Sequence, residues 1–269
     1  MVRRLHLRRD VALLGTEAHT GRNGEYAVGG KPKMKKYEFT GEVKSIDEKM
    51  LHRIRAVRDI PEHNVKAGDL GGWLETEENL SHNGAAWVMN SAYVMGKARV
   101  MGKALVADSA LVMDSAYVTG KARVTGKALV ADSASVMDSA HVMDFARVMG
   151  NALVTDSARV MGNALVMDSA YVMGKARVTD SARVMGNARV MDASDYIAIG
   201  AIGSRNDTTT FYRGKDGGIY VSCGCFNGTI DDFAAKVKQV HAGTKHERTY
   251  LLAIELAKAQ IATEEENDG

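Results

Sequence analysis

The segment VMGKAL at Val100–Leu105 belongs to a six-residue repeat that runs from Asn83 to Val190 for eighteen units without an insertion. Each unit reads Val-x-(Gly or Asp)-x-Ala-x. In an extended segment, a Val and the Ala two positions before it point to the same face, and their neighbours point to the opposite one. Because each unit can bury its apolar face only against neighbouring units, the repeat predicts a solenoid.

The third and fourth positions of the unit predict a sharp corner. Gly is followed by Lys or Asn, as at Gly102-Lys103, and Asp mostly by Ser, as at Asp108-Ser109. Glycine permits a positive φ, and an Asp side chain can bond its own backbone two residues on. Four strand residues and two corner residues, three times over, give a triangular coil of eighteen residues, so six coils fit in the repeat. An amphipathic helix is excluded, because valines six residues apart do not follow a period of 3.6.

The chain before the repeat predicts a cap. We expect residues 1–33 to be a disordered extension and residues 34–82 to form an N-terminal β cap with one further coil. Two strands, Tyr37–Ser45 and Met50–Val57, would cover the open end of the solenoid, whose strand edges otherwise invite association.

The repeat stops after residue 192, and residues 193–263 predict a small α+β module. Three strands are expected at Tyr196–Ile202, Thr208–Arg213 and Ile219–Phe226, followed by helices that begin at Thr229 and Thr244. Residues 264–269 form an acidic tail. The predicted fold class is therefore an all-β solenoid, a parallel β-helix, with a small α+β C-terminal module.

Composition restricts the range of functions. The 269 residues carry a net charge of +2, which gives no electrostatic case for nucleic acid or membrane binding, and no apolar run reaches membrane-spanning length. Cys223 and Cys225 lack the further ligands of a zinc site, so we interpret them as plain strand residues of a reducing cytosol before any redox or metal role. Turn formation explains the corner aspartates better than Ca²⁺ binding does, and no metal site is predicted.

Most of the sequence from residue 34 to residue 269 resembles a known family. The run from Ala85 to Met191 resembles the hexapeptide-repeat, left-handed parallel β-helix proteins. The segments KAGDLGGWL (66–74) and ENLS (78–81) resemble the first coil of phage and prophage members. The resemblance implies a left-handed coil and a trimer, although this chain places Gly or Asp two residues after the aliphatic position instead of one.

The same resemblance brings an enzymatic alternative. Many hexapeptide β-helices are acyltransferases in which a histidine acts as general base and acyl-CoA lies between the subunits of a trimer. The repeat holds one histidine, His141, in an outward position close to Asp138 and Asp144. No inserted loop interrupts the coils to build a substrate pocket, so we favour a non-catalytic protein without a cofactor. Acyl-CoA is expected only under the acyltransferase alternative.

One side of the predicted prism differs from the others in its outward residues. Only two of its twelve outward residues are charged, and contiguous apolar faces rich in Met are frequent at interaction surfaces. We predict that this side associates with copies of itself, most simply in a homotrimer; the alternative is that exposed Met only covers the sheet. Its outward residues are Tyr93, Met95, Leu111, Met113, Leu129, Ala131, Arg147, Met149, Leu165, Met167, Arg183 and Met185.

The C-terminal module supplies a candidate binding loop, although a plain polar hairpin is the alternative. Between two predicted strands the chain concentrates hydroxyls, an amide and a guanidinium, which can hold a phosphate or a carboxylate. We predict that it recognises a small anionic ligand or a protein partner through Ser204, Arg205, Asn206, Asp207, Thr208, Thr209, Tyr212 and Arg213.

The sequence thus predicts a phage-type scaffold or binding protein that self-associates and displays its C-terminal module. The alternatives are the acyltransferase and a passive structural protein that polymerises end to end. If the phage resemblance holds, the protein acts in the cytoplasm of an infected or lysogenic bacterium.

Overall fold

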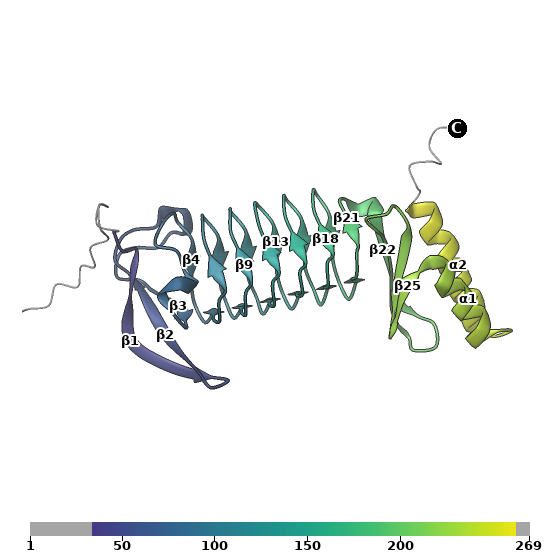
Figure 1. Ribbon diagram of the computed structural model, residues 1–269, viewed down its shortest axis with the longest axis horizontal. Coiled ribbons are helices and arrows are strands. Elements are labelled where there is room, and N and C mark those ends of the chain that lie inside the picture. Colours follow the sequence, from purple (N-terminus) through teal and green to yellow (C-terminus); the bar gives the residue numbers. More distant parts are fainter. Residues whose placement is uncertain (1–33, 262–269) are drawn as a thin grey trace, which may run out of the picture. The chain divides into compact units, whose positions relative to one another are not determined.

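The computed structural model describes residues 34–261, so the predicted disordered extension at 1–33 and the acidic tail at 264–269 lie outside the described residues. The chain divides into two compact units, Met1–Met34 and Lys35–Gly269, and every element below belongs to the second. This unit contains a stack of parallel β coils, followed by a small sheet and two helices (Figure 1). The predicted fold class is confirmed.

Eighteen two-residue strands stack in three columns, with partners eighteen residues apart. The first side holds β5 (Tyr93–Val94), β8 (Leu111–Val112), β11 (Leu129–Val130), β14 (Arg147–Val148), β17 (Leu165–Val166) and β20 (Arg183–Val184). The second side holds β4 (Trp87–Val88), β7 (Leu105–Val106), β10 (Arg123–Val124), β13 (His141–Val142), β16 (Arg159–Val160) and β19 (Arg177–Val178). The third side holds β6 (Arg99–Val100), β9 (Tyr117–Val118), β12 (Ser135–Val136), β15 (Leu153–Val154), β18 (Tyr171–Val172) and β21 (Arg189–Val190).

Val and Ala fill the interior of the coils, as the repeat predicts. From Ala86 to Val190, the side chains at these two repeat positions are at most 1% exposed. In most units three amides donate to the next coil; in one unit Leu105 donates to Ala122, Ala107 to Val124 and Ser109 to Gly126. The backbone polar groups are thus paired between coils while the interior stays apolar.

The corners use Gly and Asp in the same left-handed conformation. The glycines from Gly96 to Gly186 have φ between 60° and 72°, and the aspartates from Asp108 to Asp180 have φ between 55° and 63°. The predicted bond from each Asp to its own backbone is wrong for most corners. The carboxylate instead accepts a hydrogen bond from the corner amide one coil further on, as from Gly126 to Asp108 at 3.0 Å. The same bond occurs at Asp114, Asp132, Asp144, Asp156 and Asp168.

The N-terminal end of the stack is covered by β1 (Tyr37–Ile46), β2 (Lys49–Ala56) and β3 (Leu70–Leu74), which extend the sheet of the first side. Two short 3₁₀ turns, η1 (Pro61–His63) and η2 (Glu77–Asn79), lie in the same region. Tyr37 is buried, and its hydroxyl donates to backbone carbonyls of Glu77 and Leu80. Lys36 is buried too and donates to the Ala86 carbonyl at 2.6 Å; burial, with Arg58 adding, lowers the pKa of this amine to about 8. The predicted strand pair is confirmed.

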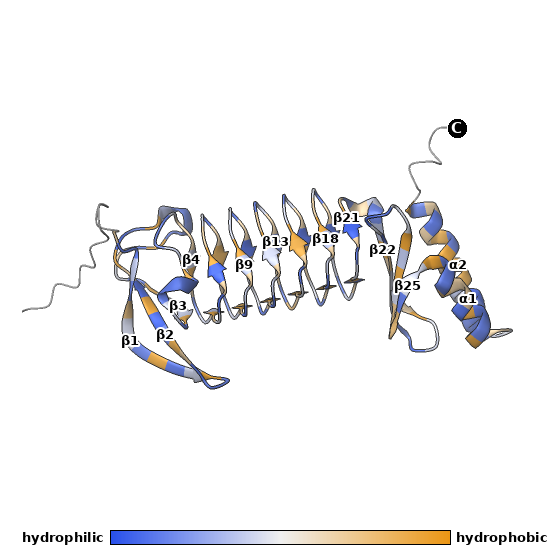
Figure 2. Ribbon diagram, in the orientation of Figure 1, coloured by the Kyte–Doolittle hydropathy of each residue, from blue (hydrophilic) through white to orange (hydrophobic). Residues whose placement is uncertain are grey.

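The C-terminal module has four antiparallel strands where three were predicted. After η3 (Ala193–Asp195) come β22 (Tyr196–Ile202), β23 (Asp207–Arg213), β24 (Ile219–Cys223) and β25 (Phe226–Thr229). The predicted third strand, Ile219–Phe226, is wrong because Gly224 has a φ of 60° and turns the chain back. Two helices follow, α1 (Ile230–His241) and α2 (Lys245–Gln260), and Thr229 and Thr244 cap them as predicted. Apolar and polar residues intersperse along both helices (Figure 2).

The sheet of this module lies between the last coil and the helices. Tyr212 belongs to the solenoid core, whereas Phe211 and Val221 pack with Phe233 and Tyr250 of the helices. The amide of Arg183 donates to the Thr210 hydroxyl at 2.9 Å, and that of Lys215 donates to the Asn187 carbonyl, also at 2.9 Å. Both ends of the coil stack are therefore covered by other parts of the chain.

Candidate functional site

A hollow of about 430 Å³ lies where η1 meets the second side of the coils. One wall comes from η1, and the other from strands β10 and β13 with the corner that precedes this side. The lining residues are Glu62, His63, Lys103, Lys121, Arg123, Ser139 and His141. We call this hollow the basic pocket, because it gathers three cations and two histidines around a single carboxylate.

The eighteen-residue period builds the wall on the coils. Arg123 and His141 are direct partners on neighbouring parallel strands. Lys103, Lys121 and Ser139 occupy one corner position in three successive coils. Neighbouring coils are about 4.8 Å apart, so these side chains reach the same small volume.

The pocket belongs to an unusual column of basic residues on the second side. Arg123, His141, Arg159 and Arg177 succeed one another on four neighbouring strands. On the other two sides, no two basic residues occupy neighbouring strands of the coils. Arg123, Arg159 and Arg177 form no ion pair, within 4.0 Å, with a carboxylate of residues 34–261. Stacked like charges repel, so the column favours a negatively charged neighbour.

His63 closes the pocket from the other side. Among the described residues, neither buried ring nitrogen of His63 has a hydrogen-bond partner of ordinary geometry, although the backbone of Lys103 is near enough to act on its pKa. Unpaired buried polar atoms are costly, and a ligand oxygen would accept a hydrogen bond from the N–H of this ring. Glu62, the one carboxylate of the pocket, pairs with Lys103 at 3.4 Å and so compensates only part of the positive charge.

Both pocket histidines have lowered pKa values. Burial is the main cause for each, and the Arg123 guanidinium adds to it at His63 and His141; Arg159 contributes further at His141. Both rings are therefore neutral near pH 7. An anion in the pocket would favour the protonated rings, which then become additional donors.

The loop predicted to bind an anion does not gather its residues at one point. Ser204, Arg205 and Asn206 are exposed in the β22–β23 connection, Asp207 is exposed at the start of β23, and Thr208 is half-buried. Three other side chains are directed elsewhere. Buried Thr209 donates to the Cys223 sulfur, buried Tyr212 donates to Asn227, and Arg213 pairs with Asp195 at 2.8 Å.

The outward residues of the first side align in one column, as the period requires. Met95 is an exception to the predicted face, because it is 2% exposed in the first coil, where Glu75 accepts from the neighbouring Gly96 amide. Met185 is also covered in part, because the Ser222 hydroxyl contacts its sulfur at 3.8 Å. Tyr93 accepts a hydrogen bond from Lys44. Ala131 is buried and Arg147 is exposed, whereas the remaining Leu and Met residues of the face are half-buried: Leu111, Met113, Leu129, Met149, Leu165 and Met167.

Other kinds of site have little support in the described part of the chain. Residues 34–261 contain no group of three or more His, Cys, Asp or Glu side chains that could hold a metal ion. None of their helices is long and apolar enough to span a membrane. Cys223 lies in β24 as predicted, whereas Cys225 is exposed in the turn after it.

Sequence reasoning found part of the basic pocket. It singled out His141, as the general base of the acyltransferase alternative. It missed His63, because η1 lies outside the six-residue repeat. The sequence around η1 therefore does not indicate which coil this segment contacts. The sequence did contain a signal for the coil side of the pocket. The eighteen-residue spacing places Lys121 next to Lys103, and His141 next to Arg123, on neighbouring coils.

No protein-family model matches this chain, and no curated protein matches it with significance.

Proposed function

We propose that this chain is a non-catalytic β-helix scaffold of the hexapeptide-repeat, phage type that binds a small anionic ligand in the basic pocket. The observation that carries the proposal is the convergence of Lys103, Lys121 and Arg123 with two histidines around one hollow. Guanidinium and ammonium groups bind phosphates and carboxylates through charge-assisted hydrogen bonds. By the same resemblance, the site of action is the cytoplasm of an infected or lysogenic bacterium.

The size of the hollow limits the ligand. A volume of about 430 Å³ lies within the range typical of small-molecule sites and exceeds what a single inorganic ion fills. The ligand class is therefore a small organic phosphate or carboxylate, with its charged group beside Arg123 and its remainder toward solvent.

Calorimetry tests the proposal. Inorganic phosphate and a panel of nucleotides are titrated into the full chain and into Arg123→Gln. The matched control is Arg99→Gln, which removes an exposed Arg from the same repeat position on the third side. We expect binding that Arg123→Gln weakens at least about tenfold, since each charge-assisted hydrogen bond contributes about 1.5–3 kcal/mol. Absence of heat with every anion, or equal weakening in both variants, would contradict the proposal.

A second candidate function, the acyltransferase, is supported by His141 itself. Its ring is neutral near pH 7, as a general base must be, and Ser139 lies in the same hollow. Against it, the coils contain no inserted loop. Turnover of acetyl-CoA by the wild type but not by His141→Ala would favour the enzyme.

We further propose that the first side self-associates, most simply as a homotrimer, through its half-buried Leu and Met residues. End-to-end polymerisation is the less favoured assembly, because it needs bare strand edges and both ends of the coil stack are covered.

A further inference from the structure

The outer face of α2 carries an apolar patch that nothing in the described part of the chain covers. α2 packs its other face on α1 and the sheet through Tyr250, Ile254 and Ala257, and half-buried Leu251, at the edge between the two faces, also contacts this core. On the outer face Leu252 is 62% exposed and Leu256 is 50% exposed. Single exposed leucines are ordinary, but two of them one turn apart form a continuous apolar stripe.

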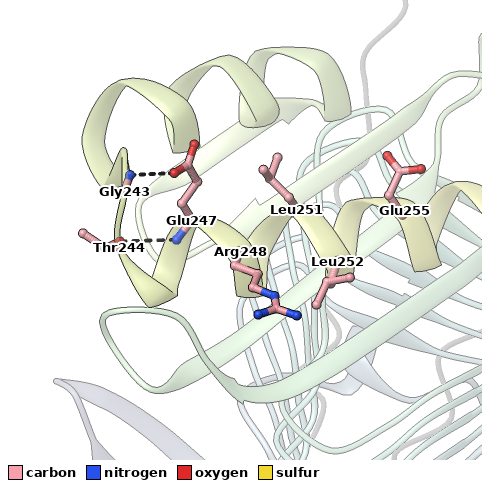
Figure 3. Close-up of a pocket in the computed structure, with 7 residues that line it drawn as sticks. All are labelled: Gly243, Thr244, Glu247, Arg248, Leu251, Leu252 and Glu255. Atoms are coloured by element: carbon pink, nitrogen blue, oxygen red, sulfur yellow. Dashed lines mark hydrogen bonds between the residues drawn. The ribbon is translucent and has the colours of Figure 1, made fainter.

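A shallow hollow of about 570 Å³ lies beside this stripe (Figure 3). Its lining residues are Gly243, Thr244, Glu247, Arg248, Leu251, Leu252 and Glu255. Glu247 is already engaged, because its carboxylate accepts from the Gly243 amide at 2.7 Å (Figure 3). The hollow is therefore bordered by two leucines and by two charges of opposite sign, Arg248 and Glu255.

Arg248 and Glu255 have no ion-pair partner among residues 34–261. They are seven residues apart, which places them two turns apart on one face of the helix, with Leu251 and Leu252 between them. A stripe with a cation at one end, an anion at the other and leucines in the middle is complementary to itself when one copy is turned end for end.

We propose that α2 docks against α2 of a second copy of this chain, antiparallel and related by a two-fold axis between Leu251 and Leu252. In this register Arg248 of each copy faces Glu255 of the other, and Leu251 faces Leu252. An isologous contact of this kind uses one surface twice, so both ion pairs and both leucine contacts occur two times. The contact uses none of the basic-pocket residues and none of the first side.

Charge complementarity is the reason to choose a second copy as the occupant. A partner with a merely apolar surface would leave Arg248 and Glu255 without counter-charges at the rim. An antiparallel copy supplies both charges at the correct spacing, and exposed helices pack at axial distances of 8–10 Å with their side chains interdigitated.

A charge-swap cycle tests the contact in the full chain. Sedimentation equilibrium compares the masses of wild type, Arg248→Glu, Glu255→Arg and the double variant Arg248→Glu/Glu255→Arg. Each single change places like charges opposite one another twice, and we expect it to weaken association at least about fivefold and to halve the assembled mass. The double variant restores opposite charges and is expected to recover the wild-type mass.

Two further variants separate this contact from misfolding and from general charge effects. Leu252→Ser is expected to weaken association with an unchanged circular dichroism spectrum, because Leu252 is exposed within the single chain. Arg99→Glu makes the same charge change on the third side and is expected to leave the mass unchanged. Equal masses for wild type and Arg248→Glu, or a double variant that does not recover, would overturn the proposal.

Discussion

At the residue scale, the corners of the coil set the strictest requirement. At Gly126, φ is 72° and an added Cβ would lie 2.8 Å from the Asp144 amide nitrogen of the next coil. A side chain here would therefore meet both the left-handed backbone and a fixed neighbour. Aspartate satisfies the same conformation elsewhere, because it tolerates a positive φ and its carboxylate binds the next corner amide.

We predict that Gly126→Ala lowers the free energy of unfolding by about 3 kcal/mol, from left-handed strain plus overpacking. The control is Gly217→Ala, which has a φ of 83° but no atom within 4 Å of the added Cβ. It should cost only about 1 kcal/mol. Urea denaturation measures both, and equal losses would show that contact between coils does not restrict the corner.

Residue identity alone predicted the corners but not every side-chain direction. The sequence groups Thr209 and Tyr212 with Ser204 in one polar cluster. In the structure, side chains alternate along β23, so Thr209 and Tyr212 point to opposite faces of a buried strand. A sheet between a solenoid and a helix pair is buried on both faces. The sequence pattern of one strand cannot reveal that second covering layer.

At the element scale, the first side is the feature that the repeat period predicted best. Because its strands stack in register, Leu111, Leu129 and Leu165 fall in one column without further information. Their stacking leaves each side chain half-buried rather than exposed. The apolar area of the face thus comes from many partly exposed residues, and exposed Arg147 interrupts it between Leu129 and Leu165.

We predict that the double change Met113→Glu/Met149→Glu lowers the mass measured by light scattering toward one third of the wild-type mass, because it buries charge in an apolar contact. Met137→Glu/Met173→Glu alters the same repeat position on the third side and serves as control. A wild-type mass of one chain, or the same loss in both double variants, would argue against association through the first side.

At the scale of the whole molecule, the basic pocket depends on segments far apart in sequence. His63 and His141 are separated by 78 residues, and only the N-terminal segment, placed over the coils, brings them to one hollow. The coil half of the pocket was predictable from period, since Arg123 and His141 are eighteen residues apart. The other half was not, because η1 is an irregular segment whose position follows from cap packing.

The most direct measurement of the central claim is the NMR titration of the histidine rings with and without inorganic phosphate. Burial and Arg123 lower the pKa values of His63 and His141 in the unliganded protein. Both rings are therefore protonated only at a pH lower than that at which an ordinary histidine is protonated. An anion stabilises the protonated rings, and its affinity rises as pH falls below neutrality. We predict that phosphate raises the pKa values of His63 and His141 together, and does so less in Arg123→Gln. Unchanged pKa values for these two rings, or shifts confined to His52 and His246, would contradict an anion site in the basic pocket.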